Sequence, residues 1–312
     1  MSLTHFFAGP YVDRRAEYRE QPDWHRDARS DASTQFLLSL GTALAVDATR
    51  REAVFVGPDH PLVSGAPDES LVLLGWFRDR RCVLVQLEGE TPSLPDIRFE
   101  ELRPLASELP ADQAGLLAYA RALTYWQRRH RHCGVCGAAT LVHRAGHVMR
   151  CSAPACGTDF FPRIDPAIIV LVSDGERALL GRAASWAEGR YSTIAGFVEP
   201  GESLEDAVAR EVLEETGVIV TASEYHSSQP WPFPSSLMLG FMALAAPGSM
   251  ARAGSELSDA RWFSREEVAS GVPVLPPPSS ISHRLIETWF DAGSTHRLRD
   301  LPRAVWTPTP AR

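Results

Sequence analysis

The strongest constraint on the fold of this chain is a short acidic segment framed by Gly196 and Gly217. Ser203 and Asp206 form an S-x-x-D capping box, and good helix formers follow without Gly or Pro until Gly217. Glycine there is typical of the left-handed residue that ends a helix. The pattern therefore predicts a loop, a helix of about three turns over Leu204–Thr216, and a turn into a strand.

One face of this expected helix is acidic. Glu211, Glu214 and Glu215 stand at i, i+3 and i+4, so they share a face and repel one another. A hard cation such as Mg²⁺ or Mn²⁺ reverses this repulsion, because it prefers oxygen ligands. Glu202 can close on the same ion from the preceding loop, and Arg210 can orient a carboxylate. The spacing alone also fits a solvated charged face without a metal.

The other side of the same helix is expected to be apolar. Ala209, Val212 and Leu213 lie away from the glutamates and are expected to face a core.

The residues from Gly196 to Val218 match the pattern G-x5-E-x7-R-E-U-x-E-E-x-G-U without gap or mismatch, where U is aliphatic. This resembles the signature of Nudix hydrolases. The resemblance implies an α+β protein with an α/β/α sandwich and a mixed sheet, which hydrolyses a nucleoside diphosphate linked to another group. It implies that Glu211, Glu214 and Glu215 bind Mg²⁺ or Mn²⁺, that Glu215 activates water, and that Arg210 belongs to the catalytic set.

The same resemblance implies further site residues outside the helix. The carbonyl of Ala195 would be a metal ligand, and Glu256 resembles a late glutamate that joins the metal site. Phe197 resembles an aromatic that stacks on adenine, and Phe161 resembles its partner from the other subunit of a homodimer. From the residues alone, each ring fits an ordinary core position equally well, and a loop glutamate is commonly solvated.

A proline-aromatic segment with the sequence SQPWPFPSS follows over residues 228–236. Each proline fixes its own φ and extends its predecessor, so we expect a stiff loop and no central strand. The segment resembles the S-Q-P-W-P-F-P-x-S motif of the NAD(H) diphosphatase branch of the Nudix hydrolases. The resemblance implies a substrate-lining role for Gln229, Pro230, Trp231, Pro232, Phe233, Pro234, Ser235 and Ser236. Without it, the two aromatic rings could equally fill a core.

This branch splits NAD(H) into NMN(H) and AMP, and its members also remove NAD caps from RNA. A weaker likeness places a substrate contact near Ser282, at the start of a helix expected over Ser279–Asp291, where backbone N–H groups can bind an anion. Two alternatives stay open: a Nudix hydrolase that prefers ADP-ribose or another dinucleotide, and an inactive nucleic-acid-binding protein.

Four cysteines precede the catalytic segment as two pairs, Cys133/Cys136 and Cys151/Cys156, with 14 residues between the pairs. Each pair is followed by glycine, and residues 144–146 read as a hairpin turn between them. Four thiolates predict a closed, structural Zn²⁺ site. The diphosphatase branch has such a ribbon, but its second pair is usually closer, which leaves Cys156 the least certain ligand. Two disulfides or free thiols are the alternatives, and the remaining Cys82 is expected to be buried.

Length and composition predict several domains. The 312 residues, 44% hydrophobic and 22% charged, are those of a globular protein of two or three domains. We expect an N-terminal β-rich degenerate domain over 1–125, the zinc ribbon over 126–162, the catalytic domain over 163–295 and a loosely held tail over 296–312. In the first domain, strands are expected over 36–46, 52–56, 69–77 and 81–87.

The net charge of −8 means that the bulk field does not attract an anionic substrate, so bound cations must supply local attraction. One basic cluster, Arg128–His132, either complements a helix end or contacts RNA. No apolar run of 18 residues and no signal peptide are found. We therefore expect no membrane span and a location in the cytoplasm.

Overall fold

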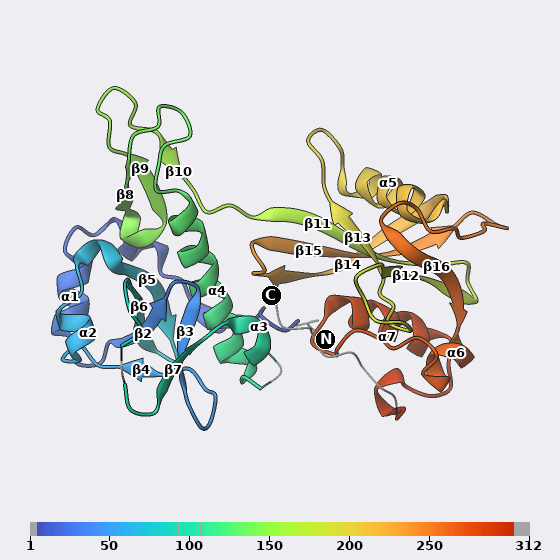
Figure 1. The fold of residues 1–312 in the computed structure, drawn as a ribbon, viewed down its shortest axis with the longest axis horizontal. Helices are drawn as coiled ribbons and strands as arrows, with labels where there is room; N and C mark the ends of the chain where they lie inside the picture. Colours follow the sequence, from blue (N-terminus) through green and yellow to red (C-terminus); the bar gives the residue numbers. More distant parts are fainter. Residues whose placement is uncertain (1–4, 93, 107, 303–312) are drawn as a thin grey trace. The chain divides into compact units, whose positions relative to one another are not determined.

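The computed structural model describes residues 5–92, 94–106 and 108–302, and its contacts divide the chain into two compact units (Figure 1). The C-terminal unit comprises Met1–Phe6, Asp165–Pro230 and Ser236–Arg312. The N-terminal unit comprises Phe7–Ile164 and Trp231–Ser235, so a short segment from late in the chain clusters with the first unit of the sequence.

A seven-stranded sheet forms the centre of the N-terminal unit, in the order β1-β5-β6-β2-β3-β7 with β4 paired to β2. Its strands are β1 (Val12–Asp13), β2 (Gln35–Leu40), β3 (Ala43–Asp47), β4 (Phe55–Val56), β5 (Leu71–Phe77), β6 (Arg80–Leu87) and β7 (Ile97–Glu100). The β2–β6 pair is parallel, with Leu38 opposite Val85, and the other pairs are antiparallel. Cys82 is fully buried in β6, as expected.

The prediction of a single strand over 36–46 was wrong, because this stretch forms two strands, β2 and β3. Gly41 has φ 59 and turns the chain between β2 and β3, which pair antiparallel with Leu40 opposite Ala43. A positive φ is accessible to glycine at little cost, so the turn signal was a single glycine inside an apolar run.

Short helices surround this sheet, and one long helix leads out of it. They are α1 (Trp24–Ser30), α2 (Pro61–Ser64), α3 (Leu102–Leu105), α4 (Ala111–Arg129), and the 3₁₀ turns η1 (Ala16–Glu20) and η2 (Asp68–Ser70). The long helix is α4. It buries an apolar stripe that includes Leu116, Leu123 and Trp126.

A small three-stranded sheet follows α4, in the order β10-β9-β8. Its strands are β8 (Thr140–His143), β9 (Val148–Cys151) and β10 (Asp159–Phe160), and the expected turn between β8 and β9 is η3 (Arg144–Gly146). Gly146 has φ 94, and a Cβ there would lie 2.6 Å from the side chain of Val72. Glycine therefore lets this turn pack closely on β5.

The C-terminal unit is built on a six-stranded mixed sheet in the order β14-β15-β11-β12-β16, with β13 paired to β11. Its strands are β11 (Asp165–Ser173), β12 (Arg177–Ala183), β13 (Ile194–Phe197), β14 (Val220–Trp231), β15 (Ser236–Ala245) and β16 (Leu257–Ser264). The helices are α5 (Leu204–Thr216), α6 (Arg265–Ser270) and α7 (Ile281–Ala292), followed by the 3₁₀ turn η4 (Leu298–Asp300). Strand β11 is parallel to β15 and antiparallel to β12 and β13.

Side chains alternate along β11 between two cores. Ile168 and Val170 join the core beneath α5, whereas Ile169 and Leu171 join the core beneath α7. This period of two means that both faces of the sheet are covered by helices. The expected α/β/α sandwich with a mixed sheet is confirmed, and α5 and α7 lie on opposite faces (Figure 1).

The acidic helix has the bounds that its sequence predicts, Leu204–Thr216. Its buried residues are Ala207, Val208, Val212 and Thr216. The expectation for Val212 is confirmed, but that for Ala209 and Leu213 is wrong, since Ala209 is exposed and Leu213 is 51% exposed. The partly buried Glu211 and Glu215 lie on the same side of α5 as these buried residues, so Ala209 and Leu213 fall on the opposite, solvent-facing side.

The proline-aromatic segment is only partly a loop. Gln229, Pro230 and Trp231 end strand β14, Pro232–Ser235 form a turn, and Ser236 begins β15. The exclusion of a central strand holds, because β14 is the edge strand of the sheet, where a proline costs no ladder hydrogen bond.

The first residues of the expected tail are held in place. Leu298 is fully buried, and Leu301 packs on the core beneath α7. The rest of the predicted tail, from residue 303 onward, lies outside the described residues. Among the residues that the structure describes, no helix is both long enough and apolar enough to span a membrane.

Candidate active site

The helix that carries the acidic residues is fixed at both ends by local hydrogen bonds. The Ser203 hydroxyl accepts from the Asp206 N–H at 3.1 Å, and the Asp206 carboxylate accepts from the Ser203 N–H at 3.2 Å. Gly217 ends the helix with φ 69. Such caps stabilise a helix by about 0.5–2 kcal/mol, and here they set the register of every glutamate on α5.

Arg210 ties the acidic residues together. Its Nη1 donates to Glu211 at 2.9 Å and to Glu214 at 3.2 Å. Its Nε and Nη2 donate to both carboxylate oxygens of Glu202 at 3.0 and 2.6 Å, and Nη2 also donates to the Phe197 carbonyl at 2.9 Å. Bidentate pairing of this kind fixes geometry as well as charge. Arg210 therefore orients carboxylates, as its position suggested.

Glu202 is the carboxylate that Arg210 contacts with two of its nitrogens. Hydrogen bonds from Arg210, and one from the Glu199 N–H, hold the pKa of Glu202 at about 2. Both Glu202 carboxylate oxygens therefore accept hydrogen bonds from the protein, and Glu202 acts as the ion-pair partner of Arg210.

Glu211 lies directly against strand β13. A Cβ built on Gly196 would lie 1.9 Å from the Glu211 carboxyl carbon. Only glycine lets the carboxylate approach the strand this closely. Ala195, whose carbonyl was expected to be a metal ligand, is the preceding residue of the same strand.

Glu215 is half-buried, and burial raises its pKa to about 7, with further contributions from Glu211, Glu256 and Glu214. Glu256 comes from another segment, just before β16. Gly254 donates its N–H to the Glu215 carbonyl at 2.7 Å, and a Cβ on Gly254 would lie 2.4 Å from the Glu214 carbonyl. The 254–256 segment is thus held against the end of α5, and four carboxylates face one region.

These carboxylates fit a divalent cation by chemistry. Four acidic side chains and a backbone carbonyl are hard oxygen donors, and accumulated negative charge around a half-buried carboxylate is what a cation would relieve. Their oxygens are less tightly gathered than the ribbon thiols, which alone among the described residues form a group of ligand atoms within 4.8 Å. Arg210 holds two of the four carboxylates, so metal binding would require those side chains to turn.

The two phenylalanines expected to stack on a base are both exposed. Phe197, at the end of β13 in the C-terminal unit, is 60% exposed, and Phe161 in the N-terminal unit is also 60% exposed. Neither ring belongs to the core of its own unit. Rings left in solvent in this way are available for stacking.

Gln229 is fully buried, and its amide is used by the protein. Its Nε2 donates to the carbonyls of Phe6 and Ser279 at 3.0 and 2.8 Å, and its Oε1 accepts from the Ile281 N–H at 2.8 Å. The residue thereby caps the start of α7. These contacts, all within the C-terminal unit, tie the end of β14 to the start of α7.

The turn that follows packs against residues of the N-terminal unit. The rings of Trp231 and Phe233 are 5.3 Å apart, and Phe7 lies edge-on to both. Arg103 lies 4.6 Å from the Phe233 ring and Arg121 lies 5.2 Å from it. Arg121 also donates to the Pro232 carbonyl. Sequence reasoning missed both arginines, because neither belongs to a motif and both lie far from the segment in the chain.

Ser282 is buried in the first turn of α7. Its hydroxyl is within 2.8 Å of the Ser192 hydroxyl and accepts from the N–H of Thr193 at 3.2 Å. The Thr193 hydroxyl lies 2.9 Å away. These contacts join α7 to the segment before β13.

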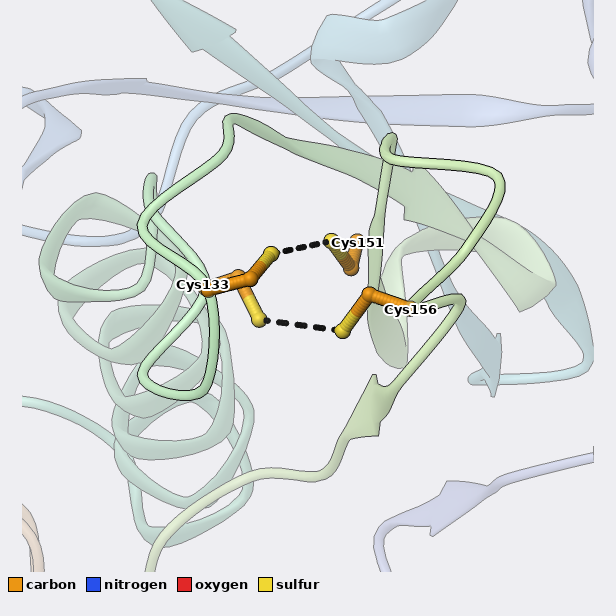
Figure 2. A group of neighbouring side chains, drawn as sticks. Cys133, Cys151 and Cys156 are labelled. Carbon is orange, nitrogen blue, oxygen red and sulfur yellow. Dashed lines mark hydrogen bonds between the residues drawn. The ribbon is translucent and has the colours of Figure 1, made fainter.

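The four ribbon cysteines converge (Figure 2). All are free thiols, the Cys133 and Cys156 sulfurs are 3.7 Å apart, and those of Cys136 and Cys151 are 3.4 Å apart. Sulfurs in tetrahedral Zn²⁺ sites lie about 3.8 Å apart, given Zn–S bonds of about 2.3 Å. Cys156 thus joins the group despite its wider spacing, and the disulfide alternative is wrong.

Backbone donors also face the sulfurs. The Val135 N–H lies 3.4 Å from the Cys133 sulfur, and hydrogen bonds from Thr158 lower the pKa of Cys156 to about 6. The glycines after each pair, Gly137 and Gly157, have φ 77 and 57. They supply the turns that direct these N–H groups inward.

Comparison with known families agrees with this geometry. The NUDIX domain matches residues 163–290, the NADH pyrophosphatase-like rudimentary NUDIX domain matches 33–126, and the NADH pyrophosphatase zinc ribbon domain matches 128–161. A mixed sheet between helices, with a capped acidic helix on one face, defines the class of Nudix hydrolases.

Individual relatives indicate which branch of the Nudix hydrolases this chain resembles. The chain is 42% identical over 217 residues to the NAD-capped RNA hydrolase NudC of Stutzerimonas stutzeri, covering 70% of this chain and 76% of that protein. It is 31% identical over 337 residues to human NAD-capped RNA hydrolase NUDT12, covering 91% and 73%. The chain belongs to the Nudix hydrolase family, in the branch with the NADH pyrophosphatase zinc ribbon.

Among solved structures, a NUDIX hydrolase from Nitrosomonas europaea matches with a TM-score of 0.44 and 21% identity, over 56% of this chain and 96% of that chain. This likeness is too distant to add to the assignment.

Proposed function

We propose that this protein hydrolyses the diphosphate of NAD(H) to NMN(H) and AMP with Mg²⁺ or Mn²⁺, and that it also removes NAD caps from RNA. The observation that carries the proposal is the half-buried Glu215 surrounded by Glu211, Glu214 and Glu256. The names of the relatives and the proline-aromatic segment support the choice of substrate.

In this proposal, different side chains bind the cations, accept the proton and orient the carboxylates. Glu211, Glu214, Glu215 and Glu256, with the Ala195 carbonyl, would hold the cations, which supply charge neutralisation of the diphosphate and lower the pKa of water. Glu215 accepts the proton as water attacks phosphorus, and the bridging P–O bond breaks to leave two monophosphates. Arg210 keeps Glu211 and Glu214 oriented. Positioning and charge supply most of the rate in phosphoryl chemistry.

Substrate contacts come from aromatic side chains. Phe197 stacks on the adenine, which is worth about 1–3 kcal/mol per base, and Phe161 closes on it from the second subunit of a homodimer. Trp231 and Phe233 contact the nicotinamide end, with Pro230, Pro232, Pro234, Ser235 and Ser236 completing the wall of the substrate site.

The proposed dimer is supported by exposed apolar side chains in and next to the ribbon, which are Val135, Leu141, Phe161 and Ile164. Four reduced thiols support a reducing compartment, the cytoplasm.

One assay tests the proposal. The protein is incubated with NADH, ADP-ribose and NAD-capped RNA in metal-free buffer, with and without Mn²⁺, and Glu215→Gln is run in parallel. Formation of AMP and NMNH only with Mn²⁺ and only by the wild type is expected. Turnover of ADP-ribose alone would move the assignment to another Nudix substrate, and no turnover at all would identify a non-enzymatic binding protein.

A further inference from the structure

The charge of the chain is unevenly distributed around the zinc ribbon. Residues 113–158 contain no Asp or Glu, although the whole chain has a net charge of −8. The same stretch contains Arg121, Arg128, Arg129, Arg131, Arg144 and Arg150. It covers most of α4 and nearly the whole ribbon, so one part of an acidic protein is locally basic.

Two of these arginines are not neutralised within the part of the chain that the structure describes. Arg121, Arg131, Arg144 and Arg150 each pair with a carboxylate from outside the stretch. Arg128 and Arg129 form no such pair there, and both are exposed in the last turn of α4. An unpaired guanidinium in a protein with excess carboxylates is a donor left for an external anion.

Arg128 also lines a cavity of about 670 Å³. Leu62, Leu87, Val142 and Met149 belong to its apolar lining, and Arg131, just beyond the end of α4, lines it as well. Thr140 and Val142 of β8 face the cavity, whereas Leu141 between them is exposed outside the lining. The volume is in the range of pockets that hold small ligands, about 300–1,000 Å³.

The lining suits one nucleotide of a single strand. Its apolar side chains can cover the face of a base, and Glu69 and Glu88 at the same wall can accept from exocyclic amino groups. Arg128 can contact the adjoining phosphate. An acidic peptide would bring only charge and no flat ring for the apolar lining to cover, so the chemistry favours a nucleotide chain.

We infer that this cavity, with Arg128 in its wall, binds the RNA chain that follows the NAD cap. The inference rests on the proposed function and adds to it a binding site for the part of the substrate that is not hydrolysed. It predicts that the cavity matters for capped RNA and not for NADH, which has no such chain.

Charge reversal provides a matched test. Arg128→Glu is compared with Arg98→Glu, because Arg98 is exposed on β7, does not line the cavity and changes the net charge equally. For NAD-capped RNA, kcat/KM of Arg128→Glu is expected to fall about tenfold, and the salt dependence of KM to lose about 0.7 in log–log slope. Arg98→Glu is expected to match the wild type, and NADH turnover is expected to be unchanged in both.

The outcomes separate the two proposals. A wild type that fails to cleave NADH contradicts the proposed function, whatever the variants do. Equal loss of RNA turnover in both variants would show a bulk field effect and overturn the cavity assignment, as would no loss in either. If Arg128→Glu loses zinc or NADH turnover, Arg128→Gln replaces it, and wild-type RNA turnover by that folded variant would also overturn the inference.

Discussion

The carboxyl carbon of Glu211 lies 1.9 Å from the point that a Cβ on Gly196 would occupy. The glycine of the signature is thus required by the position of Glu211, whose carboxylate lies against β13 next to Ala195. Arg210 holds the same carboxylate from the other side at 2.9 Å. The position of Glu211 is therefore set by a missing methyl group and one guanidinium.

Gly196→Ala is expected to displace the Glu211 side chain and little else. The clashing atoms are the end of a flexible side chain, so the melting temperature should change by only a few degrees. Misplacing a catalytic group by about 1 Å costs about 100-fold in rate, so kcat should fall by that order. Gly57→Ala is the control, because its Cβ would meet nothing within 4 Å. Wild-type kcat in Gly196→Ala would show that Glu211 is not needed in this position.

Glu215→Gln is expected to lower kcat by on the order of 10³ while leaving the fold intact. The change also removes one of four facing carboxylates, so the metal-free protein should be no less stable than the wild type. Kinetics with Mn²⁺ and thermal melting without it measure the two effects. Glu205→Gln, in the exposed first turn of the same helix, should retain activity. Equal rates for wild type and Glu215→Gln would remove Glu215 from the mechanism.

Local signals explain why much of this site could be predicted from the sequence. The bounds of α5 depend on Ser203, Asp206 and Gly217, which act within one turn of the helix ends. The ribbon turn at 144–146 is likewise set by nearby residues. In each case the deciding interaction is between residues close in the chain.

The parts that could not be predicted depend on distant residues. Nothing near Gln229 indicates that its amide caps α7, and nothing near Arg121 indicates that it reaches Pro232. The exposure of Leu213 depends on which strands lie beneath α5. The strand assignment of Pro230 depends on β14 lying at the sheet edge. Such contacts arise from tertiary packing, which spacing alone does not encode.

Cys156→Ser is expected to abolish stoichiometric zinc binding, because a closed structural site needs all four thiolates. Zinc content by atomic absorption and protease sensitivity of the ribbon are the measurements. Cys82→Ala is the matched control: Cys82 is fully buried in β6, away from the four-thiol group, and its loss should leave zinc in place. Full zinc content in Cys156→Ser would mean that another residue completes the site.

Arg121→Gln is expected to loosen the turn that carries Trp231 and Phe233. It removes the hydrogen bond to Pro232 and the guanidinium 5.2 Å from the Phe233 ring. Because the turn is proposed to bind substrate, KM for NADH should rise about tenfold, equivalent to about 1.4 kcal/mol, while kcat changes little. Arg98→Gln should leave both constants unchanged. An unaltered KM in Arg121→Gln would show that the turn keeps its position without this arginine.

His147 should make the stability of the N-terminal unit depend on pH. It is 8% exposed, its Nε2 lies 2.6 Å from the Tyr119 hydroxyl, and burial lowers its pKa from 6.5 to about 4, assisted by the charge of Arg19. The folded state therefore favours the neutral ring. Above pH 6.5 the His147 ring is neutral in both the folded and the unfolded protein, so the free energy of unfolding does not depend on this group there. Between pH 6.5 and 4 the unfolded state binds more protons, so the free energy of unfolding falls as pH falls, by up to roughly 3 kcal/mol.

Urea unfolding between pH 7.5 and 4.5 measures this dependence. His147→Gln should be less stable than the wild type at pH 7.5, because it loses the Tyr119 contact, but it should lose less additional stability on acidification. Protonation of the zinc ligands contributes to the wild type and the variant alike, so the difference between the two slopes isolates the imidazole. His143→Gln, on the same hairpin, should retain the wild-type slope. Parallel pH curves for the wild type and His147→Gln would show that the buried ring does not resist protonation.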